Sequence, residues 1–208
     1  MTLAGLRLWA DEEKRIQTCL IAALQELIEQ VVVKPEDEEI IVSGKLRPLV
    51  VIHSRENRLD WTLHPEASIF ADETSAKPSG HPDFQFSRRD TEGNQIDYDV
   101  ECKLVRINRQ GKSWDYCEYY VTGGVVDRFV EGKYCRNLPS GTMIGYVQEG
   151  KPSKLLSEIN KKVKAAGISV IRKAGKWQNQ GVTYLTQRLH RKKTPKDFRL
   201  THLWADLR

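Results

Sequence analysis

The spacing of apolar residues near the N-terminus predicts a long amphipathic helix over residues 8–33. Residues at intervals of three and four share one stripe of such a helix, and here they are Trp9, Ile16, Leu20, Leu24, Leu27 and Val31. Pro35 and the acidic run 36–39 end the pattern. Glu13 also falls on this stripe, about 20° from Leu20. A carboxylate on a buried face needs a compensating cation or metal ion.

A β-hairpin is predicted where apolar and polar residues alternate on both sides of a turn signal. The first strand covers residues 83–88, the turn covers 91–94, and the second strand covers 95–107. One face of the second strand is apolar. The other face carries Asp97, Asp99, Glu101 and Lys103.

The other elements follow from similar patterns. We expect a helix over 114–134, a short buried strand over 143–147 and a final strand over 200–207. A basic amphipathic helix over 154–166 is expected to be capped by Ser153 and stopped by Gly167. Residues 49–52 fit either a strand or a helical turn, and residues 61–70 are expected to be extended. This order predicts an α/β fold in which residues 1–208 form a single domain.

Composition is that of an ordinary globular protein, with 39% hydrophobic and 29% charged residues among 208. No stretch approaches the roughly 20 apolar residues of a membrane span, and the first residues lack the features of a secretory signal. We therefore expect a cytoplasmic protein with no membrane partner. The four cysteines are too few and too widely spaced for a disulfide framework, so we expect reduced, buried thiols.

Positive charge is concentrated in residues 151–208, which hold 15 Lys or Arg against 3 acids, whereas residues 1–150 hold 18 bases and 25 acids. Such a concentration suits a phosphate backbone, although a solvated helix face would look the same. The candidate nucleic-acid contacts in this basic C-terminal part are Lys161, Lys162, Arg188, Arg191, Lys192 and Lys193.

The hairpin brings ionisable side chains together at its open end. If the turn centres near Gly93, Asp83 lies opposite Lys103, and Glu101 lies one step away on the same face. Two carboxylates at this range repel each other unless a cation lies between them, and Mg²⁺ prefers such ligands. Lys103 points to the same side and can hold or polarise a bound water. These parts indicate a hydrolytic site.

This set resembles the PD-(D/E)XK nuclease superfamily. Pro82-Asp83 supplies the first half of its motif and Glu101-Cys102-Lys103 the second, with 17 residues between the acids. The resemblance implies a restriction-endonuclease-like core, a mixed central β-sheet flanked by helices on both faces. It also implies Mg²⁺-dependent hydrolysis of DNA, or sometimes RNA, with Mn²⁺ as a substitute. An acid on the first helix often joins the metal ligands in such enzymes, which suggests this role for Glu13.

Residues 119–147 are similar to small stand-alone nucleases of prokaryotic defence systems, in the run 120–130 and the strand 143–147. This similarity implies a role in anti-phage defence and places Arg128 toward the substrate phosphates. Alternatively, Arg128 pairs with an acid on the sheet. A partner ATPase or sensor that activates the chain, and a homodimer, are both compatible with its size.

Other chemistries lack support in the sequence. The five histidines show no spacing typical of a zinc site, and no Gly-rich phosphate loop occurs. The competing interpretation is a non-catalytic nucleic-acid-binding or protein-docking subunit of a defence or repair complex. The intact set Asp83, Glu101 and Lys103 argues for the enzyme. Sequence specificity and endonuclease or exonuclease action stay open.

Overall fold

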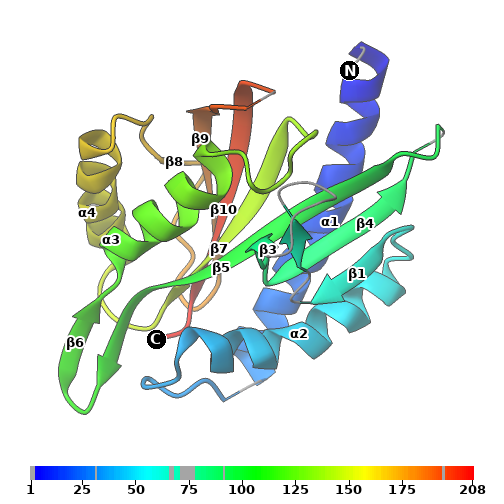
Figure 1. Cartoon of the computed structure of the whole chain (residues 1–208). Coiled ribbons are helices and arrows are strands. Elements are labelled where there is room, and N and C mark those ends of the chain that lie inside the picture. Colours follow the sequence, from blue (N-terminus) through cyan, green and yellow to red (C-terminus); the bar gives the residue numbers. More distant parts are fainter. Residues whose placement is uncertain (1–2, 31, 66–67, 71–77, 91, 194) are drawn as a thin grey trace.

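A computed structural model describes the chain except residues 1–2, 31, 66–67, 71–77, 91 and 194. Its centre is a mixed sheet of eight strands in the described part, in the order β1-β4-β5-β7-β10-β9-β8, with β6 paired to β5 (Figure 1). The strands of this sheet are β1 (Thr62–Pro65), β4 (Phe84–Arg89), β5 (Gln95–Arg109), β6 (Lys112–Asp115), β7 (Ser140–Val147), β8 (Arg172–Lys173), β9 (Val182–His190) and β10 (Asp197–Asp206). The short pair β2 (Ile69–Phe70) and β3 (Pro78–Gly80) lies apart from it.

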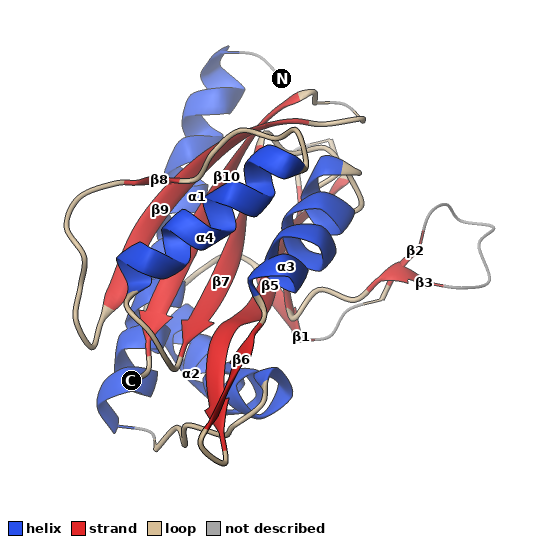
Figure 2. Cartoon of the chain, turned by 90° about the vertical axis from the view of Figure 1, so that its left-hand side faces the viewer, coloured by secondary structure: helices blue, strands red, loops and turns tan. Residues whose placement is uncertain are grey.

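Helices cover both faces of the sheet (Figure 2). Two of them, α1 (Leu3–Gln30) and α2 (Glu39–Glu56), lie on one face. The other face carries α3 (Cys117–Tyr119), which continues into the π-helix η1 (Tyr120–Val130), and α4 (Pro152–Ala165). The α/β class with a mixed sheet between helices is therefore confirmed.

The centre of the sheet is parallel and buried on both sides. β7 pairs in parallel with β5 and with β10, and its eight residues are all buried. Strands covered on both faces read as continuous apolar runs, which is why residues 143–147 stand out in the sequence. The connection from β5 to β7 passes through η1, which therefore packs over the strand that carries Glu101 and Lys103.

Several predicted elements are confirmed. The apolar stripe of α1 is buried, with Ile16, Leu20, Leu24 and Leu27 fully covered. The hairpin β4–β5 and the strands β7 and β10 also form. Gly167 follows α4 with a positive φ of 71°, as a helix stop requires. All four cysteines are free and buried.

Residues 49–52 belong to α2, a helix that also contains Pro48, so the helical of the two alternatives is the observed one. Other predictions need correction. Trp114 lies in strand β6, so the predicted helix over 114–134 begins only at Cys117. α4 begins at Pro152 after Lys151 with no side-chain cap, so Ser153 is not its N-cap. Strand β9 was not predicted at all.

Parts of three predictions lie outside the described residues, namely Val31 of the apolar stripe, residues 66–67 of the extended segment and Thr91 of the turn. Residues 62–65 and 69–70 of that segment are strands. Within the described chain, no helix combines the length and apolar character that crossing a membrane requires.

Candidate active site

The candidate site forms at a gap in the pairing of β5. Strand β4 accompanies β5 up to the pair Phe84 and Val100, and β6 begins only at the pair of Arg106 with Asp115. Between these points the same edge of β5 faces no strand. Backbone N–H groups at a gap of this kind need other acceptors.

Two carboxylates accept those N–H groups. Asp83, directly before β4, accepts a hydrogen bond from the backbone N–H of Cys102 through Oδ2 at 2.7 Å. Glu39, the first residue of α2, accepts one from the N–H of Leu104 through Oε2 at 3.0 Å. The fold thus fixes both acids beside Glu101 and Lys103, whose side chains leave β5 within the gap.

The ammonium group of Lys103 lies between acids. Its Nζ is 2.9 Å from Oε1 of Glu101 and 2.8 Å from Oε1 of Glu39, and it donates to the carbonyl of Cys102 at 2.8 Å. Burial works to lower the pKa of Lys103, but the surrounding carboxylates outweigh it and raise the pKa above its ordinary value. Lys103 therefore carries its proton at all physiological pH values and acts as a fixed positive charge.

Glu101 supplies the oxygen that most needs a partner. The residue is 2% exposed, and its Oε2 atom is buried without a hydrogen-bond donor among the described residues. Its Oε1 atom faces Lys103 and lies 3.5 Å from Nε of Arg128. A buried, unpartnered carboxylate oxygen is costly, and a bound cation would remove that cost.

Asp83 is a second carboxyl group whose ionised form is disfavoured in the metal-free protein. Burial, followed by the nearby charge of Glu101, raises the pKa of Asp83 to about 7. Without a further cation, the carboxyl group is therefore about half protonated at neutral pH. A divalent cation would favour the ionised form and so bind with release of a proton.

These donors fit Mg²⁺ bound by Asp83 and Glu101. Both are hard oxygen ligands, and Mg²⁺ is commonly held by one or two carboxylates together with water. A second group, Asp115, Cys117 and Glu158, gathers its ligand atoms within 4.8 Å, and is alone in doing so among the described residues. There, however, the guanidinium group of Arg106 already contacts Asp115 at 3.2 Å and Glu158 at 2.7 Å.

The π-helix η1 packs against β5 beside the site, and Gly124 allows the helix to lie close to this strand. A Cβ atom at Gly124 would collide with Cε of Met143 and lie 3.5 Å from Cγ of Lys103. The helix can therefore pack directly on the stem of Lys103. π-Helices are rare and often occur at functional sites. The same helix supplies Arg128.

Arg128 pairs with acids in this structure. Its guanidinium group contacts Glu101 and also Asp127 at 2.8 Å, and it lies over the ring of Tyr134 at 5.4 Å. The alternative raised in the sequence analysis, an ion pair with an acid on the sheet, is thus the observed arrangement. Arg128 is nevertheless partly exposed beside the site.

The hairpin register differs from the predicted one. Phe84 pairs with Val100, so the next position, Asp83, is level with Glu101 rather than with Lys103. The turn is thus centred about one residue earlier than Gly93. Because the register is shifted only slightly, the carboxylate of Asp83 still reaches β5 within the gap, at the N–H of Cys102.

Glu13 does not join the site. It contacts the hydroxyl of Tyr98, whose side chain leaves β5 on the face opposite to that of Glu101, since even and odd positions alternate. Glu13 forms an ion pair with Arg199 and accepts a hydrogen bond from Gln17 at 3.0 Å. The partner that its buried position demands is thus an arginine rather than a metal ion.

Of the basic residues in the C-terminal part, one is buried and the others lie on separate elements. Arg191 is 1% exposed and donates to the carbonyls of Tyr134 and Cys135, so it is a structural residue and cannot contact nucleic acid. The remaining five are distributed over three elements. Lys161 and Lys162 lie on α4, with Lys162 paired to Glu118; Arg188 lies exposed on β9; Lys192, which pairs with Glu131, and Lys193 follow β9.

Glu39 is the site residue that sequence reasoning missed. It belongs to the acidic run 36–39, which predicts only the end of the first helix. No signal in the sequence distinguishes Glu39 from its acidic neighbours, because its role depends on how α2 meets β5.

Comparisons of the chain with protein-family models, with curated proteins and with solved structures find no match. The features that bear on function are therefore the geometry around Asp83, Glu101 and Lys103 and the motif that these residues form.

Proposed function

We propose that this chain is a Mg²⁺-dependent nuclease of the PD-(D/E)XK type that hydrolyses phosphodiester bonds in DNA. The observation that carries the proposal is the convergence of Asp83, Glu101 and Lys103 at the gap in β5, with a buried oxygen of Glu101 left without a donor. The mixed sheet between helices is compatible with a restriction-endonuclease-like core.

Each residue has a defined part in this proposal. Asp83 and Glu101 hold the cation through their carboxylate oxygens, while the Cys102 N–H fixes the orientation of Asp83. A Mg²⁺ ion bound there would supply positive charge to a phosphate oxygen and make water a stronger nucleophile. Lys103, permanently protonated, would exchange one of its three present acceptors for the attacking water and stabilise the negative charge that develops on the phosphate.

Glu39 is a positioning residue in this scheme. It holds Lys103 together with Glu101 and fixes the backbone at Leu104. Arg128 reaches Glu101 from η1 and is close enough to exchange this contact for a substrate phosphate.

A role in prokaryotic defence is part of the proposal. The segment that resembles defence nucleases forms η1 and β7, which pack against β5 next to the site. Activation by a partner ATPase or sensor would explain a chain that is inactive alone.

The test is cleavage of supercoiled plasmid and of labelled single strands by purified protein, with Mg²⁺ or with EDTA. We expect Mg²⁺-dependent cutting that falls at least 100-fold in Asp83→Asn and in Lys103→Met. Asp11→Asn and Lys14→Met change the same charges at exposed positions of α1 and should cut normally. Equal cutting by the site variants and the wild type would overturn the proposal.

One observation favours a second candidate, a non-catalytic binding subunit. The charges of Lys103 and Arg128 are already paired with Glu101 and its neighbours, so the site is partly neutralised internally. Metal-independent DNA binding without cutting, even after addition of candidate partner proteins, would support this alternative.

A further inference from the structure

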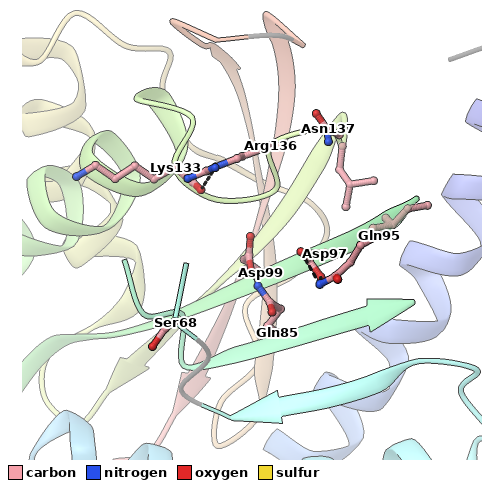
Figure 3. A pocket seen from close by; sticks show the side chains of 10 residues that line it. Ser68, Gln85, Gln95, Asp97, Asp99, Lys133, Arg136 and Asn137 are labelled. Atoms are coloured by element: carbon pink, nitrogen blue, oxygen red, sulfur yellow. Dashed lines mark hydrogen bonds between the residues drawn. The ribbon is translucent and has the colours of Figure 1, made fainter. Parts of the chain in front are cut away.

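A polar cavity of about 240 Å³ lies beside the candidate active site, on the face of the sheet that carries Glu101 (Figure 3). Asp97 and Asp99 alternate with Glu101 along β5, so their side chains leave the strand on the same side. Two residues advance a strand by about 7 Å. The lining residue Asp99 is therefore one such step along β5 from Glu101.

The floor of the cavity consists of buried polar groups. Asp99 is 2% exposed and Gln85 is 8% exposed, and Nε2 of Gln85 donates to Oδ1 of Asp99 at 2.8 Å. Figure 3 shows these two side chains turned toward each other, with Asp97 and Gln95 beside them. Polar groups collected beneath a cavity are stabilised by a ligand that hydrogen-bonds to them.

The wall of the cavity is held in a fixed shape. The backbone N–H of Cys135 donates to Oδ2 of Asp99 at 2.6 Å, and Cys135 has a positive φ of 49°. The buried guanidinium group of Arg191 donates to the carbonyls of Cys135 at 3.0 Å and Tyr134 at 2.9 Å. Since this loop is ordered by its own contacts, a ligand would find a preformed site, which lowers the entropic cost of binding.

The lining indicates the chemistry of the ligand. Asp97 and Asp99 are acceptors that repel phosphate. Lys133 and Arg136 also line the cavity, but the ammonium group of Lys133 is paired with Asp127, so a polyphosphate does not suit the floor. Amide side chains of Gln85, Gln95 and Asn137 both donate and accept hydrogen bonds. The edge of a nucleobase combines donors and acceptors in this way, and carboxylates accept hydrogen bonds from its exocyclic amino group.

We propose that the cavity binds an unpaired nucleobase with an exocyclic amino group, from a nucleotide next to the phosphodiester held at Asp83 and Glu101. This inference rests on the proposed function, because the base and the phosphate belong to one nucleic acid. Thymine, which lacks the amino group, is a poor ligand. A base in a duplex reaches the cavity only after it leaves the stack.

The test is fluorescence anisotropy at about pH 8.5 with Ca²⁺, using labelled single-stranded oligo(dC) and oligo(dT) of equal length. We expect oligo(dC) to bind about tenfold more tightly, as a matched contact to a base edge allows. Asp97→Ala and Gln85→Met should remove this preference and leave the binding of oligo(dT) unchanged. Asp11→Ala, which removes an exposed acid of α1, should keep the preference.

Equal affinity of the two oligonucleotides for the wild type, or a preference that survives in both cavity variants, would overturn the inference. The proposed nuclease activity is judged separately by plasmid cutting. Cutting without a preference for oligo(dC) refutes the base site alone. A preference that both cavity variants lose, with no cutting even after candidate partner proteins are added, supports the base site and refutes the nuclease.

Discussion

Replacing Asp83 by Asn is expected to stabilise the metal-free protein above neutral pH. The pKa of Asp83 rises from an ordinary 3.8 to about 7, so the folded state binds its proton more tightly than the unfolded state does. The free energy of unfolding of the wild type therefore falls between about pH 4 and pH 7 and is level above that. Asn has no proton to lose and keeps an oxygen that can accept from the Cys102 N–H.

The magnitude follows from the same pKa. Each factor of ten in proton affinity corresponds to about 1.4 kcal/mol, so ionising Asp83 in the folded state costs at most about 4 kcal/mol. The raised pKa already includes the attraction of Lys103 for the carboxylate, and burying the amide of Asn has a cost of its own, so we expect a net gain of about 2 kcal/mol at pH 8.5. The difference in free energy of unfolding between the variant and the wild type is measured by urea unfolding in EDTA at about pH 4.5 and pH 8.5, with circular dichroism as the signal.

Adding Mg²⁺ should reverse the order of the two proteins. A cation that binds the folded wild type at 100 times its dissociation constant adds about 2.7 kcal/mol, whereas the Asn variant lacks one ligand and should gain little. If the variant is no more stable than the wild type at pH 8.5 in EDTA, folding does not raise the pKa of Asp83. Equal stabilisation of both proteins by Mg²⁺ would place the cation elsewhere.

Four further substitutions, one of them a control, probe other parts of the structure. Glu13→Gln should leave Mg²⁺-dependent cutting within about threefold of the wild type, because Glu13 lies on the face of the sheet opposite to that of Glu101. A 100-fold loss of cutting in a folded variant would show that Glu13 belongs to the active site. Gly124→Ala should destabilise the protein by about 1–3 kcal/mol in urea unfolding, since its Cβ atom would collide with Met143. At Gly44 a Cβ atom meets nothing within 4 Å, so Gly44→Ala should be neutral or stabilising. Arg191→Met should cost about 2–4 kcal/mol, because the loop carbonyls lose buried donors, and an unchanged urea midpoint would contradict this role.

The sequence predicts the parts of the fold that have one clear periodicity. The stripe of α1 and the alternation of β4 and β5 are visible because one face is buried and the other is polar. α2 is harder to recognise, since Pro48 lies within it and its apolar residues at 49–52 are consecutive. Strand β9 alternates buried and less buried positions, but its basic residues and those beyond it suggest a solvated surface instead.

The candidate site was predictable only where it depends on local spacing. Asp83, Glu101 and Lys103 meet because a hairpin of this length brings its ends together. Glu39 and Glu13 show the limit of such reasoning, because both are acids on helices and their partners are distant in sequence. Arg191 shows the same limit, since a cation in a basic tail serves here as an internal donor to a loop.

The gap in β5 also bears on how the chain avoids unwanted association. A central strand with free N–H groups is a template for an extended peptide or for a second copy of the chain. Carboxylates from Asp83 and Glu39 occupy those donors, so the residues that suit the site for a cation also protect its backbone. Removing both acids would leave the amides of Cys102 and Leu104 open to strand addition, so such a double variant should form aggregates more readily than either single one.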